Sequence, residues 1–187
     1  MSSDDKPART LVLGGVKSGK SAYAALLAHS HASNTGAELV LIATATALDQ
    51  EMTDRINRHK IERDDSWRVV EEPLALASTI STITQNAKTN SVGTCIVIDC
   101  LTLWITNLLL ADDQYRLEQE VASFIQAVNT CQVPLLMVSN ETNMGITPLG
   151  DLSRRFCDET GLLHQQLAKS CEHVVLMVAG LPVSVKG

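Results

Sequence analysis

Gly14-Gly-Val-Lys-Ser-Gly-Lys-Ser21 fits the phosphate-binding loop pattern G-x-x-x-x-G-K-S/T and constrains the fold of this chain more than any other segment. Its glycines let the backbone curl so that successive N–H groups point at phosphate oxygens. Lys20 supplies a positive charge for the β- and γ-phosphates, and the hydroxyl of Ser21 suits Mg²⁺. The segment therefore predicts a site for a nucleoside triphosphate.

The residues on either side of the loop support this interpretation. Arg9-Thr-Leu-Val-Leu13 is short and apolar, which is typical of a strand, and Ser21-Ala-Tyr-Ala-Ala-Leu-Leu-Ala28 is rich in strong helix formers. Strand, loop and helix in this order are the arrangement that a phosphate-binding loop requires. This context disfavours the alternative, which is a chance glycine turn.

The composition is that of a packed globular protein, with 187 residues, 45% of them hydrophobic, and a net charge of −6. We expect a disordered polar tail at residues 1–8 without the features of a signal peptide, and a single domain over residues 9–187. The negative charge argues against a nucleic-acid partner. Leu101 to Leu110 is the nearest approach to a membrane span and is too short for one. Five cysteines without a C-x-x-C pair fit reduced thiols, so we expect a cytoplasmic protein.

Apolar runs of strand length alternate with segments of helical periodicity along the chain. The expected strands are residues 10–13, 39–43, 95–99, 135–138 and 174–178, with weaker candidates at 67–70 and 183–185. The expected helices are residues 21–32, 49–63, 74–87, 114–130 and 152–169. Continuous Leu, Val and Ile strands separated by helices predict a sheet buried on both faces. The predicted fold class is therefore α/β, a three-layer domain like the P-loop nucleotide hydrolases with a mostly parallel central sheet.

Polar residues follow the ends of the expected strands, where open α/β sheets bind their ligands. Cys95-Ile-Val-Ile-Asp99 is an apolar strand that ends in a carboxylate, and Asp99 is the best-placed partner for Mg²⁺ beside Ser21. The alternative for Asp99 is an ordinary cap on the next helix. Glu141, after the strand at residues 135–138, is a candidate to take a substrate proton, with a structural capping role as the alternative.

Residues 49–63 form a highly charged segment whose plain interpretation is a solvated helix face. His59 lies within it among basic neighbours, which favour the neutral, nucleophilic imidazole. The same neighbours suit a docked phosphate, and histidine can form covalent intermediates with phosphoryl groups. The residues alone leave both interpretations open.

Further segments, together with the loop, carry a family resemblance. They are Ile42-Ala-Thr-Ala45, Asp49–Lys60, Trp67-Arg-Val-Val-Glu-Glu-Pro73, Ile98–Leu109, Val138–Pro148, Leu152–Asp158 and Gly161–Leu167. In this order, over nearly the whole chain, they resemble the bifunctional adenosylcobinamide kinase / adenosylcobinamide-phosphate guanylyltransferase family of cobalamin biosynthesis. Two positions depart from the family, which usually has arginine at Lys17 and often has glycine or a small apolar residue at Asn143. Lysine lacks the planar fork of arginine, so the phosphate contact at Lys17 would differ in detail.

The resemblance implies a two-step enzyme and a homo-oligomer. The enzyme would phosphorylate the aminopropanol hydroxyl of adenosylcobinamide with ATP or GTP, and then transfer GMP from GTP onto that phosphate to give adenosylcobinamide-GDP. His59 matches the histidine that carries GMP, Lys20 is the second implied catalytic residue, and Ser21 and Asp99 would hold Mg²⁺. The implied nucleotide contacts are Gly14, Gly15, Val16, Lys17, Ser18, Gly19, Lys20, Ser21, Ala43, Thr44, Ala45, Lys60, Ile61, Glu62, Arg63, Glu71 and Asp99.

Two other functions are consistent with a phosphate-binding loop. One is a small-molecule kinase without guanylyl transfer. The other is a GTP-binding switch, which would carry an Asn-Lys-x-Asp guanine reader and an Asp-x-x-Gly switch. Here Asp99 is followed by Cys-Leu-Thr and Asn140 by Glu-Thr-Asn, which argues against the switch.

Overall fold

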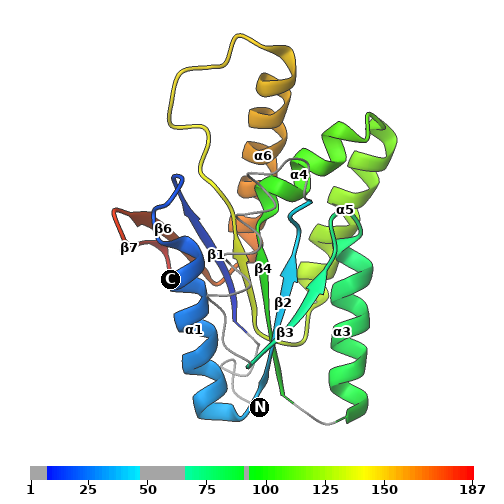
Figure 1. The fold of residues 1–187 in the computed structure, drawn as a ribbon, viewed down its shortest axis with the longest axis vertical. Helices are drawn as coiled ribbons and strands as arrows, with labels where there is room; N and C mark the ends of the chain where they lie inside the picture. The colour runs from blue at the N-terminus through cyan, green and yellow to red at the C-terminus, as the bar shows by residue number, and fades with distance from the viewer. Residues whose placement is uncertain (1–7, 47–65, 91–92) are drawn as a thin grey trace.

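The computed structural model describes residues 8–46, 66–90 and 93–187 (Figure 1). The expected helix at residues 49–63 and all but the last residue of the expected tail lie outside these ranges. The elements in chain order are β1 (Arg9–Gly14), α1 (Lys20–Thr35), β2 (Glu38–Ala43), β3 (Trp67–Glu71), α3 (Leu76–Asn90), β4 (Thr94–Asp99), α4 (Leu101–Leu110), α5 (Gln114–Thr130), β5 (Leu135–Val138), α6 (Asp151–Ser170), β6 (His173–Val178) and β7 (Leu181–Lys186).

The strands form one sheet in the order β3-β2-β4-β5-β1-β6-β7. Every neighbouring pair is parallel except β6 and β7, which form an antiparallel hairpin. The predicted α/β class with a mostly parallel sheet is therefore confirmed. Both weak strand candidates are also confirmed, because they form β3 and β7 at the two edges of the sheet.

Helices cover both faces of the sheet, with α1 on one face and α3, α4, α5 and α6 on the other (Figure 1). Alternate residues of a strand point to opposite faces. Val12 of β1 accordingly packs in the cluster that contains Ala24 and Ala28 of α1, whereas Leu11 packs in the larger cluster under the other helices. The first helix thus packs closely on the sheet through small side chains. Its N-terminus follows the carboxyl end of β1 after a short loop.

Helix α4 was not among the expected helices, and its sequence explains why. Leu101–Leu110 is apolar on almost every side, so it lacks the one-sided pattern by which surface helices are recognised. Most of its side chains are buried, and Trp104 is fully buried against Phe124 of α5. Among the described helices, none combines the length and the hydropathy needed to cross a bilayer.

Candidate active site

The phosphate-binding loop leaves β1 at Gly14 and takes a course that requires glycine. The backbone angle φ is +152° at Gly14 and +95° at Gly19, a region that residues with a side chain rarely adopt. A Cβ atom on Gly14 would also lie 2.6 Å from both the Met177 carbonyl oxygen and Ser18 Oγ. Both the backbone conformation and the lack of space for a Cβ atom therefore favour glycine at the positions that define the sequence pattern.

Neighbouring segments hold the loop on two sides. In the turn between β6 and β7, Gly180 N donates a hydrogen bond of 3.1 Å to Ser18 O, and a Cβ on Gly19 would come within 3.3 Å of Gly180 Cα. Beyond β5, Glu141 N donates a hydrogen bond of 2.9 Å to Gly14 O. The two strands that flank β1 in the sheet, β5 and β6, thus lead into segments that contact the loop and support its course.

Lys20 is buried within the loop, with 7% of its surface exposed. Its Nζ donates a hydrogen bond of 2.7 Å to Gly15 O. Burial lowers the pKa of Lys20, and the nearby Cys100 thiol and Asp99 carboxylate oppose the shift. A buried ammonium group is costly unless anionic groups replace its lost water. Polyphosphate oxygens are well suited to that role.

The register of the sheet brings three predicted residues into one row at its carboxyl edge. Ala43 of β2 is aligned with Glu71 of β3 on one side and with Asp99 of β4 on the other. Aligned residues of neighbouring strands point to the same face. Leu41 and Val97, two positions earlier, belong to the cluster under α1, so this row also points to the α1 face. The small Ala43 side chain leaves space between the two carboxylates on the side where the loop enters α1.

Ser21 and Asp99 offer the oxygen donors that Mg²⁺ prefers. Ser21 is exposed at the start of α1, and Asp99 is partly exposed and close enough to Lys20 to affect its pKa. Within the described ranges no hydrogen bond engages the Asp99 carboxylate. The N-cap of α4 is Cys100, so Asp99 does not serve as that cap. The two side chains therefore fit a hard divalent cation.

Asn107 of α4 joins the ends of β2 and β3. Its Nδ2 donates hydrogen bonds of 2.8 Å to Thr44 O and 3.1 Å to Pro73 O. The hydroxyl of Thr44 in turn donates to Cys100 O at 2.7 Å and accepts from Cys100 N at 2.9 Å. Asn107 could not be identified from the sequence, because its partners are 63 and 34 positions away and no local pattern marks them.

Part of the predicted site lies outside the described residues, namely His59, Lys60, Ile61, Glu62 and Arg63. The other predicted contacts are described and lie on two neighbouring parts of the carboxyl edge. Residues 14–21 form the loop, and residues 43–45, Glu71 and Asp99 lie at the ends of β2, β3 and β4. The roles of all these residues stay predictions.

A buried histidine links the end of β5 to α6. His164 Nε2 and Ser139 Oγ share a hydrogen bond of 2.8 Å, and both residues are buried. Ser139 N donates a hydrogen bond of 3.0 Å to Val12 O, which places the pair beside the start of the loop. Glu141 Oε1 accepts a hydrogen bond of 2.7 Å from Asn143 N, so in this structure its carboxylate shapes a turn.

The burial of His164 predicts a loss of stability in acid. Burial lowers the pKa of His164, and the nearby Glu141 carboxylate opposes the shift. Below the unfolded-state pKa of about 6.5, the unfolded chain takes up a proton that the folded chain does not, so the free energy of unfolding decreases until the folded pKa is passed. We expect His164→Asn to lose less stability than the wild type between about pH 8 and pH 5, as measured by urea denaturation. Equal losses in the two proteins would contradict this assignment.

Comparisons with known proteins identify relatives over nearly the whole chain. A family model described as "Cobinamide kinase / cobinamide phosphate guanyltransferase" matches residues 10–185. The chain is 46% identical over 179 residues to the "Bifunctional adenosylcobalamin biosynthesis protein CobP" of Pseudomonas aeruginosa, a match that covers 96% of this chain and 98% of the relative. It is 36% identical over 190 residues to the "Bifunctional adenosylcobalamin biosynthesis protein CobU" of Escherichia coli, covering 94% of this chain and 98% of the relative.

The structure is also similar to a solved ATPase domain, with a TM-score of 0.53 at 13% sequence identity, over 90% of this chain and 68% of that domain. That likeness supports the fold alone. The family model and the two relatives agree with each other and with the loop geometry. On these matches, the chain belongs to the cobinamide kinase / cobinamide phosphate guanyltransferase family of bifunctional enzymes.

Proposed function

We propose that this chain phosphorylates adenosylcobinamide with ATP or GTP and then transfers GMP from GTP to adenosylcobinamide phosphate, giving adenosylcobinamide-GDP. The observation that carries this proposal is a buried Lys20 inside a phosphate-binding loop, in a chain of this family. A homo-oligomer, a cytoplasmic location and the lack of a nucleic-acid partner stay predictions.

In the first step, the substrate hydroxyl oxygen attacks the γ-phosphorus of the nucleotide. The bond to the oxygen that bridges the β- and γ-phosphates breaks, the nucleoside diphosphate leaves, and the hydroxyl proton is released. Lys20 and the loop N–H groups stabilise the charge that develops on the phosphate oxygens. Ser21 and Asp99 would hold Mg²⁺, which supplies further positive charge to the triphosphate when bound.

In the second step, an imidazole nitrogen of His59 attacks the α-phosphorus of GTP and pyrophosphate leaves. The phosphate oxygen of adenosylcobinamide phosphate then attacks the same phosphorus, and the P–N bond to His59 breaks. The covalent route divides one difficult exchange into two displacements. Lys20 would hold the departing pyrophosphate, so the same loop serves both steps.

GTP labelled at its α-phosphate tests the covalent step. We expect the wild type to acquire an acid-labile, alkali-stable label, which adenosylcobinamide phosphate then removes. His59→Ala should abolish labelling and GMP transfer while the kinase step persists. His31→Ala, which changes a histidine of α1, is the matched control and should label like the wild type. A label that survives in His59→Ala would exclude His59 as its carrier, and kinase activity without any label in the wild type would indicate a plain kinase.

A further inference from the structure

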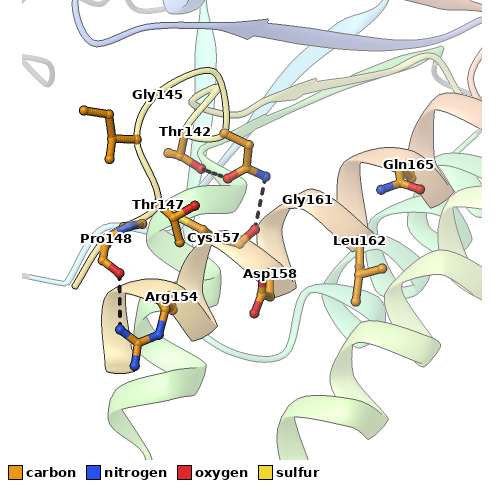
Figure 2. Close-up of a pocket in the computed structure, with 12 residues that line it drawn as sticks. Thr142, Gly145, Thr147, Pro148, Arg154, Cys157, Asp158, Gly161, Leu162 and Gln165 are labelled. Carbon is orange, nitrogen blue, oxygen red and sulfur yellow. Dashed lines mark hydrogen bonds between the residues drawn. The ribbon is translucent and has the colours of Figure 1, made fainter. Parts of the chain in front are cut away.

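An open pocket of about 690 Å³ lies between the loop that follows β5 and the first part of α6 (Figure 2). Volumes of this size are typical of sites for small molecules. The pocket begins at Thr142, the residue after Glu141, whose N–H donates to Gly14 O of the phosphate loop. Since consecutive Cα atoms are about 3.8 Å apart, one end of the pocket adjoins the predicted nucleotide site.

The loop is attached to α6 at both ends of the pocket. At the near end, Asn143 Nδ2 donates a hydrogen bond of 3.1 Å to Cys157 O, and Gly161 gives this amide room because a Cβ there would lie 2.5 Å from it. At the far end, Arg154 donates a hydrogen bond of 3.3 Å to Pro148 O (Figure 2). Between these attachments the loop stands away from the helix, and Figure 1 shows it projecting beyond the carboxyl edge of the sheet. The pocket is therefore open to a ligand larger than its own volume.

Large apolar side chains are exposed around this pocket. Ile146 and Leu162 line it and are 98% and 55% exposed, and the nearby loop residues Met144 and Leu149 are 76% and 96% exposed. Apolar side chains gathered in one place on a surface mark a binding site more often than scattered ones do. Because the pocket adjoins the predicted nucleotide site at its Thr142 end, the second substrate of the enzyme is the natural occupant.

Polar side chains that can both donate and accept hydrogen bonds line the pocket beside the apolar residues. The side-chain amides of Asn143 and Gln165 and the hydroxyl of Thr147 line the pocket and can each donate and accept hydrogen bonds. The charge of Arg154 is balanced by a salt bridge to Asp151. The exposed carboxylate of Asp158 leaves the lining with a negative charge.

We propose that this pocket seats the corrin ring of the cobinamide substrate, an assignment that rests on the proposed function. A cobalt(III) corrin is a broad, flat cation with apolar faces and a rim of amide side chains. Ile146 and Leu162 suit its face, Asn143 and Gln165 suit its amides, and Asp158 suits its charge. With the ring in the pocket, the arm that carries the reacting hydroxyl starts beside Thr142 and extends toward the phosphate loop.

Alkylation of Cys157 tests the assignment on the unaltered protein. Cys157 lines the pocket and is partly exposed, whereas the other four cysteines are buried. We expect adenosylcobinamide, added in the dark, to slow alkylation of Cys157 by iodoacetamide by about tenfold at saturation, and GTP alone to leave the rate unchanged. An unchanged rate with adenosylcobinamide, under conditions where the enzyme phosphorylates it, would overturn the assignment and leave the proposed function standing.

Substitutions provide the second arm of the test. We expect Ile146→Asp and Leu162→Glu each to raise the KM for adenosylcobinamide by about tenfold or more, with GTP affinity unchanged and kcat within about twofold. Val183→Asp, which alters an exposed apolar residue of β7, is the matched control and should keep the wild-type KM. A wild-type KM in both pocket variants would overturn the assignment. A drop in sedimenting mass in those variants would instead identify the surface as an interface between copies of the chain, which also overturns it.

A wild-type protein that binds GTP but neither binds nor phosphorylates adenosylcobinamide would refute the proposed function itself, and the pocket assignment with it. The two failures are therefore distinguished by whether the unaltered enzyme turns over the corrinoid.

Discussion

Lys20→Ala is expected to lower both the kinase activity and the GMP transfer by at least about 10²- to 10³-fold, the usual cost of removing one group that stabilises developing charge. Lys20 is buried in the loop, where its ammonium group donates a hydrogen bond to Gly15 O. Kinase transfer needs the γ-phosphate held there, and guanylylation needs the departing pyrophosphate held there. Both activities should therefore fall together, as measured with the same preparation by transfer from γ-labelled and α-labelled GTP.

The fold should survive this substitution. The substitution removes both the unfavourable burial of the ammonium group and its hydrogen bond to Gly15 O, and these two effects on stability oppose each other. We expect the melting temperature of Lys20→Ala to stay close to that of the wild type. Lys88→Ala, an exposed lysine in the last turn of α3, is the matched control and should keep both activities. Retained GMP transfer with lost kinase activity would mean that the two reactions use separate nucleotide sites.

Trp104→Ala is expected to reduce the free energy of unfolding by about 3–5 kcal/mol, as large-to-small changes of buried aromatic residues do. The Trp104 side chain is fully buried, and its ring centroid lies 4.9 Å from that of Phe124. Its indole N–H donates a hydrogen bond of 2.7 Å to Leu74 O, which would lose its partner. A loss of this size is a large fraction of the total stability of an ordinary domain.

Urea denaturation measures the effect, provided the slope with urea concentration is the same in each protein. Trp104→Phe is the informative comparison, because it keeps a buried ring and loses only part of the volume and the hydrogen bond. We expect it to cost about 1–2 kcal/mol. If Trp104→Ala unfolded within about 1 kcal/mol of the wild type, the core under α4 would be less tightly packed than the structure indicates.

Much of the fold follows from local patterns in the chain. The strands were predicted because each is a short, continuous apolar run, and the loop because its glycines and lysine have a fixed spacing. Helix α4 was missed because burial on nearly all sides removes the periodicity that reveals a helix. The order of the strands is set by contacts between segments far apart in the chain, and no local pattern encodes it.

In the site, too, local sequence patterns reveal some residues, whereas contacts between distant segments determine others. Asp99 was predictable because it ends an apolar strand, and residues at the ends of parallel strands meet at one edge of a sheet. Ala43 and Glu71 were implied only by the family resemblance, and the register of the sheet aligns them with Asp99. Asn107 and the pair of Ser139 with His164 were not predictable, since each acts through a partner that only the folded chain brings near. Ser139 and His164 are 25 positions apart, and His164 alone shows only that it belongs to an amphipathic helix.

The contacts of Met177 and Gly180 with the phosphate loop bear on how the protein is made. A nascent chain on the ribosome carries the whole loop long before residues 177–180 have been synthesised. Until β6 and β7 join the sheet, Gly14 lacks its close packing against Met177, and Ser18 O lacks its hydrogen bond from Gly180 N. The loop thus completes its native contacts only after β6 and β7 have joined the sheet, and tight nucleotide binding during folding would report that these two strands have docked.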